Sequence, residues 1–212
     1  MKNLEYFIWD FDGTLFNTYP AIALTIVNLL KKNYNKDLSF NNVKELCQDS
    51  LYSCFNQISK ELNIDREKLQ QEFAREYSNT KESEEPPFSG VIEILKFIRN
   101  KGGKNFIVTH RGKKKLYKLI KYYKMRHLFE DIITREHGYP KKPNPTSFLY
   151  LIEKYKIPRE KIISIGDRDI DIQAARKINI NSCYFNPNGK INHLADLNIR
   201  SLFDFKKKII LN

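Results

Sequence analysis

The sequence predicts an α/β fold, in which helices cover both faces of a parallel sheet and a helical segment interrupts the order of strands and helices. Short runs of β-branched and aromatic residues recur along the chain, and the later runs are separated by segments of helical periodicity. Four helix-like segments also follow one another with no strand between them, which predicts the insertion. With 212 residues, 41% of them hydrophobic, the chain is long enough to bury a substantial core.

The first predicted strand is LEYFIW, residues 4–9, and its continuous apolar character suits a strand buried on both faces. Helix-like segments then occupy roughly residues 20–33, 40–48, 50–62 and 65–78, and the acidic stretch KESEEPP follows them as a return linker. We therefore expect a core domain made of residues 1–16 and 86–212, with a helical domain of residues 17–85 inserted into it.

The rest of the chain alternates between strands and helices. Further strands are predicted at NFIVT (105–109), DIIT (131–134), IISIG (162–166) and SCYF (182–185). Helices are predicted at GVIEILKFIRN (90–100), at a basic segment, at PTSFLYLIEKYK and at IDIQAARKIN. Asn144 is the expected N-cap of the third of these helices, with Pro145 at its first position.

The basic segment, residues 111–126, contains Lys or Arg at eight of its sixteen positions in a chain of net charge +12. Leu116, Leu119, Ile120 and Tyr123 recur at helical spacing, so we interpret the segment as an amphipathic helix with solvated lysines. The charge alone therefore does not predict a nucleic-acid partner. Because the helix begins near the phosphate site proposed below, it could still steer anionic substrates inward.

The composition also limits the class of protein. Cys47, Cys54 and Cys183 have spacings that match neither a zinc motif nor a disulfide framework, so we expect free thiols. The first apolar run reaches Asp10 too early for a signal peptide, and no run approaches the roughly 18 apolar residues of a membrane-spanning helix. We expect a soluble, cytoplasmic protein without a membrane partner.

Two carboxylates, Asp10 and Asp12, follow the first strand, where ligands of such sheets bind. They alternate with Phe11, so both can project towards one end of the sheet. Neighbouring carboxylates push their pKa values apart, so that one can act as a nucleophile while the other carries a proton. Gly13 and Thr14 suit a turn whose N–H groups could hold an anion. The alternative reading is a surface Asx turn.

A second pair of carboxylates, Asp167 and Asp171, lies in GDRDID at the junction between a strand and a helix, where both can face the first pair. Several acids without a His or Cys cluster favour an oxygen-preferring cation such as Mg²⁺. The alternative is that these two residues only cap the helix and complement its dipole.

Two further residues could bind phosphate. Lys142 is held in KKPNP between prolines and can pair with a phosphoryl oxygen, although Lys141 competes for this role. Thr109 offers a hydroxyl at the end of the second strand, next to the N–H of His110. The alternatives are that Lys142 is an exposed loop lysine and that Thr109 only closes a surface turn.

Taken in order, DFDGTLF, VTH, KKPNP and GDRDID resemble the four motifs of the haloacid dehalogenase-like hydrolase superfamily, and the resemblance spans nearly the whole chain. It implies a Rossmann-like three-layer core with a parallel sheet and a small inserted α-helical cap. The helical insertion after the first motif is similar to the cap of the subfamily that contains phosphoglycolate phosphatases, β-phosphoglucomutases and haloacid dehalogenases.

The resemblance also implies roles for individual residues. Asp10 would be the nucleophile that forms an aspartyl-phosphate, and Asp12 would protonate the leaving oxygen and then activate water. Mg²⁺ would be held by Asp10, the backbone carbonyl of Asp12 and Asp167, with Asp171 as a ligand or a support. Thr109 and Lys142 would hold the phosphoryl oxygens.

One residue departs from the family pattern: His110 stands where the family often has Asn. We consider that His110 either contacts the substrate or the cap, or forms a hydrogen bond within its own loop. Phe16, Asn17 and Tyr19, at the entrance to the insertion, are guesses for substrate contacts.

The function expected from this resemblance is that of a Mg²⁺-dependent phosphatase acting on a small phosphorylated metabolite. The presence of Asp12 argues against dehalogenase chemistry, because the dehalogenases lack this second acid. A phosphomutase similar to β-phosphoglucomutase is one alternative. The other is a weakly active protein whose basic face binds RNA or an acidic protein.

Overall fold

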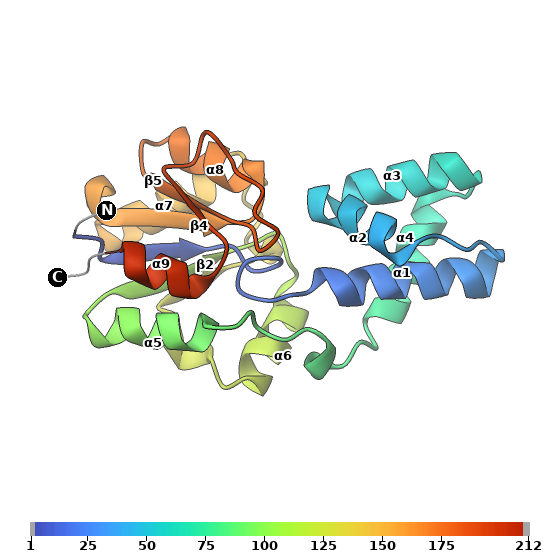
Figure 1. Cartoon of the computed structure of the whole chain (residues 1–212), viewed down its shortest axis with the longest axis horizontal. Coiled ribbons are helices and arrows are strands. Elements are labelled where there is room, and N and C mark those ends of the chain that lie inside the picture. The colour runs from blue at the N-terminus through green and yellow to red at the C-terminus, as the bar shows by residue number, and fades with distance from the viewer. Residues whose placement is uncertain (1–2, 210–212) are drawn as a thin grey trace. The chain divides into compact units, whose positions relative to one another are not determined.

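The computed structural model describes residues 3–209 of the chain, which divides into two compact units. One unit is made of Met1–Phe16 and Pro87–Asn212, and the other is the continuous segment Asn17–Pro86. We call the first the sheet unit and the second the helical unit, and Figure 1 labels the elements of both.

The sheet unit contains six parallel strands in the order β3-β2-β1-β4-β5-β6. They are β1 (Tyr6–Trp9), β2 (Lys104–Val108), β3 (Asp131–Ile133), β4 (Ile162–Gly166), β5 (Asn181–Phe185) and β6 (Leu197–Ile199). The predicted α/β fold is therefore confirmed. The short strand β6 was not predicted, because Asn198 interrupts its apolar residues and it pairs only at the edge of the sheet.

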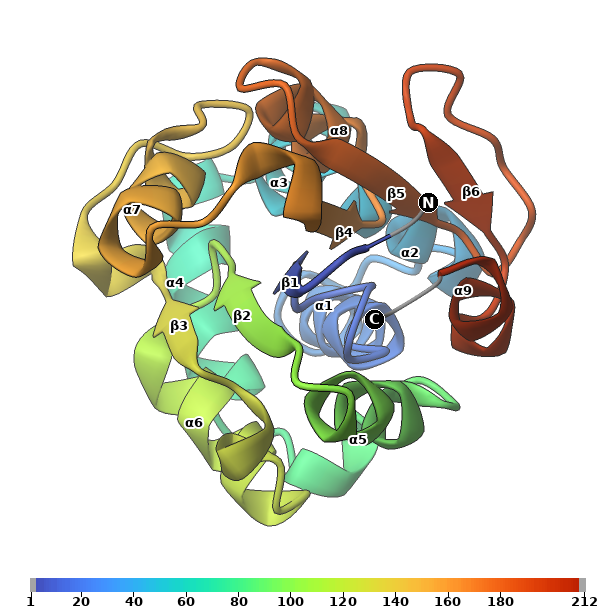
Figure 2. The ribbon, with the colours of Figure 1, turned by 90° about the vertical axis from the view of Figure 1, so that its left-hand side faces the viewer.

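Helices cover both faces of this sheet, as Figure 2 shows. They are α5 (Val91–Asn100), α6 (Lys113–Tyr122), α7 (Thr146–Tyr155), α8 (Asp169–Arg176) and α9 (Leu202–Lys208). Successive residues of β1 serve opposite faces: Phe7 and Trp9 join the core formed with α5, α6 and α9, whereas Ile8 joins the core formed with α7 and α8. The apolar character of β1 thus follows from burial on both sides.

Two predicted helix starts are corrected. The basic helix begins at Lys113 rather than at residue 111, because Gly112 has an extended backbone, and it ends at Tyr122. Leu116, Leu119 and Ile120 of its predicted apolar stripe are buried, whereas Tyr123 follows the helix and is half-buried. The helix α7 begins at Thr146 with Pro145 as its N-cap, one residue later than predicted. Asn144 Oδ1 accepts a hydrogen bond from the Thr146 N–H at 3.0 Å.

The helical unit contains α1 (Tyr19–Tyr34), α2 (Phe40–Asp49), α3 (Leu51–Leu62) and α4 (Arg66–Tyr77). Their apolar faces form one core, which includes Ile26, Phe55 and Ile58. Side-chain caps fix two of the helix starts, since Ser50 Oγ accepts from the Ser53 N–H and Asp65 Oδ1 accepts from the Lys68 N–H.

Short 3₁₀ turns complete the two units. They are η1 (Glu82–Glu84), η2 (Arg126–Leu128), η3 (Arg135–His137) and η4 (Arg159–Lys161).

The three cysteines are buried free thiols, and Cys47 Sγ lies 3.5 Å from Cys54 Sγ within the helical unit. Within residues 3–209, no helix combines the length and hydropathy that crossing a membrane requires.

Candidate active site

The strand order reverses its direction between β1 and β4, and the candidate site lies at the carboxyl ends of these two strands. Asp10 follows β1 directly, and its N–H donates a hydrogen bond to the Ile165 carbonyl of β4 at 2.9 Å. Asp167 follows the last residue of β4, Gly166. The pairing of two central strands therefore brings together residues that are far apart in the sequence.

An acidic cluster is formed by Asp10, Asp167 and Asp171, each of which offers a carboxylate oxygen within 4.8 Å of the others. Thr14 Oγ1 donates to Asp167 Oδ1 at 3.0 Å and so orients that carboxylate. A Cβ at Gly166 would lie 2.3 Å from Asp171 Cγ, so only glycine permits the close approach of Asp171. Three converging carboxylates form an oxygen donor set that fits Mg²⁺.

Lys142 extends into this cluster from the loop before α7. Its Nζ lies 2.6 Å from Asp10 Oδ1 and 2.5 Å from Asp171 Oδ1, and it also donates to the Val108 carbonyl at 3.0 Å. The side chain of Lys142 is 1% exposed, whereas the neighbouring Lys141 is exposed. Buried charges of this kind are tolerated only when they are paired, so removing one member leaves the others uncompensated.

Burial and neighbouring charges shift the pKa values of this cluster. Loss of solvation raises the pKa of Asp10 to about 6, and the opposing effect of the Lys142 ammonium does not cancel it. Burial alone would lower the pKa of Lys142, but the carboxylates of Asp10 and Asp171 raise it. The lysine therefore stays charged beside Asp10.

The Asp12 carboxylate does not join the acidic cluster. It forms an ion pair with the guanidinium of Arg111, whose side chain is only 7% exposed. From the sequence, Arg111 was expected only to add positive charge at the start of a basic helix. The only signal for this contact was the position of Arg111 two residues after Thr109, in a loop that follows a strand adjacent to β1.

Thr109 and His110 connect the loops around the site. The Thr109 N–H donates to the Ile133 carbonyl at 3.0 Å, and its hydroxyl oxygen accepts from the Arg111 N–H at 3.1 Å. His110 Nε2 accepts from the Lys142 N–H at 2.8 Å. Burial, with a further contribution from the Lys142 charge, lowers the pKa of His110 to about 3, so the imidazole is a neutral acceptor at physiological pH.

Two expected substrate contacts are corrected by the structure. The Gly13 N–H is not directed to an anion, because it donates to the Phe16 carbonyl at 2.8 Å and closes the turn, with Gly13 at a φ of 80°. The Phe16 side chain is fully buried and stacks on Phe11 at 4.5 Å between ring centroids. A side chain without exposed surface cannot contact a ligand, and the prediction failed because this aromatic residue belongs to the core.

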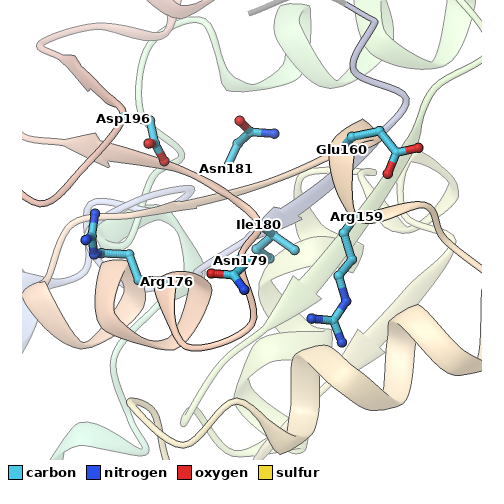
Figure 3. Close-up of a pocket in the computed structure, with 7 residues that line it drawn as sticks. All are labelled: Arg159, Glu160, Arg176, Asn179, Ile180, Asn181 and Asp196. Atoms are coloured by element: carbon cyan, nitrogen blue, oxygen red, sulfur yellow. The ribbon is translucent and has the colours of Figure 1, made fainter.

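Figure 3 shows a separate hollow at the amino ends of β4 and β5, which is the opposite edge of the sheet. Two of its polar side chains form hydrogen bonds within the fold. Arg159 Nη1 donates to the Ile178 carbonyl, and Asp196 Oδ2 accepts from the Ser182 N–H. Glu160 and Asp196 line this hollow, and neither belongs to the acidic cluster at the carboxyl ends of the strands.

Comparison with known proteins gives results that agree with this geometry. The family model "Haloacid dehalogenase-like hydrolase" matches residues 7–185. A phosphoglycolate phosphatase from Aquifex aeolicus is 24% identical over 174 residues, covering 82% of this chain and 81% of its own. The pyrophosphatase PpaX from Bacillus pumilus is 24% identical over 165 residues, covering 78% and 75% of the two chains.

A solved structure also resembles this chain. It is titled a predicted phosphoglycolate phosphatase from Haemophilus somnus, and it aligns with a TM-score of 0.83 at 22% identity over 98% of both chains. At this identity the likeness establishes the fold.

Proposed function

Because the chain belongs to the haloacid dehalogenase-like hydrolase family, we propose that it hydrolyses a small phosphomonoester in a Mg²⁺-dependent reaction that forms an aspartyl-phosphate. The predicted assignment to the hydrolases is confirmed by the family match. The observation that carries the finer proposal is the buried Asp10 carboxylate, which is held by the Lys142 ammonium beside two more carboxylates.

Asp10 is the proposed nucleophile. One of its carboxylate oxygens forms a bond to phosphorus while the bond between phosphorus and the leaving oxygen breaks. The Lys142 contact supports this role, since a fixed ammonium orients the carboxylate and can bind a phosphoryl oxygen as negative charge redistributes. Thr109, at the end of the neighbouring strand, is proposed as a second contact for the phosphoryl oxygens.

Asp12 is the proposed acid and base. It would donate a proton to the leaving oxygen in the first step and take one from the attacking water in the second, which releases phosphate and restores Asp10. Its side chain lies outside the acidic cluster, which supports this division of roles, because a carboxylate that ligates the cation is less able to exchange protons.

Asp10, Asp167 and Asp171 are the proposed side chains for holding Mg²⁺, together with the backbone carbonyl of Asp12. A bound Mg²⁺ would neutralise the clustered carboxylates and the phosphoryl oxygens. The fit rests on the oxygen-only donor set and on the orientation of Asp167 by Thr14.

The helical unit is proposed to act as a cap that selects the leaving group and excludes water. It is inserted between Phe16 and Pro87, directly after the loop that carries Asp10 and Asp12. Because the relatives include a phosphoglycolate phosphatase and a pyrophosphatase, phosphoglycolate and pyrophosphate are the first substrates to test.

Release of inorganic phosphate from a panel of metabolites, measured with and without Mg²⁺, tests the proposal. The panel would contain phosphoglycolate, pyrophosphate, sugar phosphates and nucleoside monophosphates. We expect release that requires Mg²⁺ and is abolished in Asp10→Asn, whereas Asp169→Asn, an exposed acid outside the cluster, stays active. Full activity in Asp10→Asn would refute the proposed nucleophile, and bisphosphate-dependent turnover without net phosphate release would indicate a mutase.

A further inference from the structure

The ion pair between Arg111 and Asp12 is an unusual contact for a surface-loop arginine. The Asp12 side chain is 25% exposed, but that of Arg111 is 7% exposed. Arginine is almost never buried to this degree unless its charge is paired. The Asp12 carboxylate therefore supplies the charge that compensates the buried guanidinium.

Arg111 is anchored independently of that ion pair. Its backbone N–H donates to Thr109 Oγ1 at 3.1 Å, and its carbonyl accepts from the Arg135 N–H at 3.2 Å. The guanidinium lies over the ring of Phe11, 5.5 Å from the centroid. Because Phe11 is itself fully buried, these contacts fix the guanidinium relative to the loop that carries both acids.

From this arrangement we infer that Arg111 is a positioning residue that acts through Asp12. It holds one carboxylate oxygen of Asp12 and thereby sets the direction in which this side chain presents its proton to the leaving oxygen. The inference rests on the proposed function, because it assumes that Asp12 is the acid of that reaction. It replaces the expectation that Arg111 merely steers anionic substrates, since the Asp12 carboxylate offsets the guanidinium charge that such steering would use.

This role predicts a dependence on the leaving group. An alkyl phosphate needs a proton on its leaving oxygen as the bond to phosphorus breaks, whereas p-nitrophenyl phosphate releases a stable phenolate and needs little help. Misdirecting Asp12 should therefore slow the first chemical step much more for the alkyl phosphate than for p-nitrophenyl phosphate. A residue that held the phosphoryl group itself would affect both substrates equally.

The first experiment compares Arg111→Gln with the native protein on an alkyl phosphate and on p-nitrophenyl phosphate. We expect kcat/KM, which reflects the first step and not the hydrolysis of the shared aspartyl-phosphate, to fall about 10- to 100-fold on the alkyl ester and by less than about threefold on the aryl ester. Arg111→Lys keeps the charge but not the planar fork, and should show the same selectivity in a smaller degree. Lys114→Gln, which removes an exposed charge of α6, should match the native protein.

The second experiment is a double-mutant cycle with Asp12→Asn, followed with p-nitrophenyl phosphate and the alkyl ester. If Arg111 acts through Asp12, adding Arg111→Gln to Asp12→Asn should cause no further loss on either substrate. Equal losses of kcat/KM on the two esters, or losses that multiply in the cycle, would refute the inference. Failure of the proposed function would look different, because the native protein would then hydrolyse neither ester or Asp10→Asn would keep its activity.

Discussion

The sheet unit and the helical unit bury different kinds of groups. The sheet unit encloses three ionisable side chains in contact, Asp10, Lys142 and Asp171, each with no more than 5% of its surface exposed. The core of the helical unit is apolar, and ion pairs such as Lys31–Asp37 and Lys32–Glu76 lie on its surface. Glu85, its buried carboxylate, accepts from the Tyr77 hydroxyl.

This difference separates a packed core from a site. Burying apolar side chains stabilises a fold directly, whereas burying charges costs free energy unless every charge is paired. Substitutions in the apolar core of the helical unit should therefore act through stability. The acidic cluster of the sheet unit should respond through activity, through metal binding and through a balance of charge that changes with pH.

The largest expected effect is on activity. Asp10→Asn should lower kcat about 10⁴-fold or more, since an amide is a poor nucleophile. The free energy of unfolding without metal should stay equal or rise, because the substitution removes a buried charge and leaves Lys142 paired with Asp171. Phosphate release and urea unfolding measure the two quantities, and a large loss of stability would contradict this separation of activity from folding.

Lys142→Met tests the balance of charge. It leaves Asp10 and Asp171 buried without their shared cation, so we expect a loss of about 3–5 kcal/mol in unfolding free energy at neutral pH. Mg²⁺ or acid pH should recover part of the loss, because either one reduces the uncompensated negative charge. The adjacent exposed residue supplies the control, and Lys141→Met should stay within about 0.5 kcal/mol of the native protein.

Ile58→Ala tests the helical unit. The Ile58 side chain is fully buried, and truncating it should cost about 2–5 kcal/mol through lost packing. Unlike Lys142→Met, this loss should be independent of pH and of Mg²⁺. Chemical unfolding at several pH values measures it, with Leu24→Ala as an exposed control within the same unit. If the loss of unfolding free energy in Ile58→Ala varied with Mg²⁺, the proposed difference between the two units would be wrong.

The sequence predicted most of the fold and the main members of the site for physical reasons. The ends of parallel strands meet at one edge, so Asp10 and Asp167 could be brought together from strand assignments alone. Lys142 was distinguished from Lys141 by its position next to proline, and it is the lysine that reaches Asp10. These inferences depend on the order of the strands along the chain and on the stiffness of a proline-containing loop, and both can be read from a sequence.

Contacts that depend on the course of a loop could not be predicted. The pairing of Arg111 with Asp12 requires two loops, after β1 and after β2, to turn towards each other. The burial of Phe16 depends on its stacking with Phe11 rather than on hydrophobicity alone. The elements β6 and α9 are too short to show a clear period.

The pH dependence of stability sharpens the comparison further. The pKa of Asp10 lies at about 6 in the folded chain against an ordinary value of 3.8, so the folded state binds this proton more tightly. The stabilisation that this tighter proton binding gives the folded state is complete below about pH 4 and is lost as the pH rises through 6. Burial is the main cause, with Lys142 and Arg168 opposing it and Asp171 adding to it.

We therefore expect the metal-free protein to lose stability between pH 4 and 6 relative to Asp10→Asn, in which this titration is absent. Urea unfolding in EDTA at intervals across this range measures the difference. A constant difference between the two proteins would contradict the raised pKa. Because Mg²⁺ binds the ionised carboxylate, its stabilising effect should increase over the same range.

The smallest expected effect concerns His110, whose imidazole accepts a hydrogen bond from the Lys142 backbone N–H. His110→Ala removes the acceptor of the Lys142 N–H and should cost about 1 kcal/mol, seen as roughly a fivefold lower kcat. His110→Asn, whose amide oxygen can replace the imidazole nitrogen, should recover part of this loss. Since the His110 pKa is about 3, the pH profile of kcat between pH 5 and 8 should keep its shape in both variants. If the rise or the fall of kcat with pH disappeared in either variant, His110 would itself take part in proton transfer, in addition to Asp12.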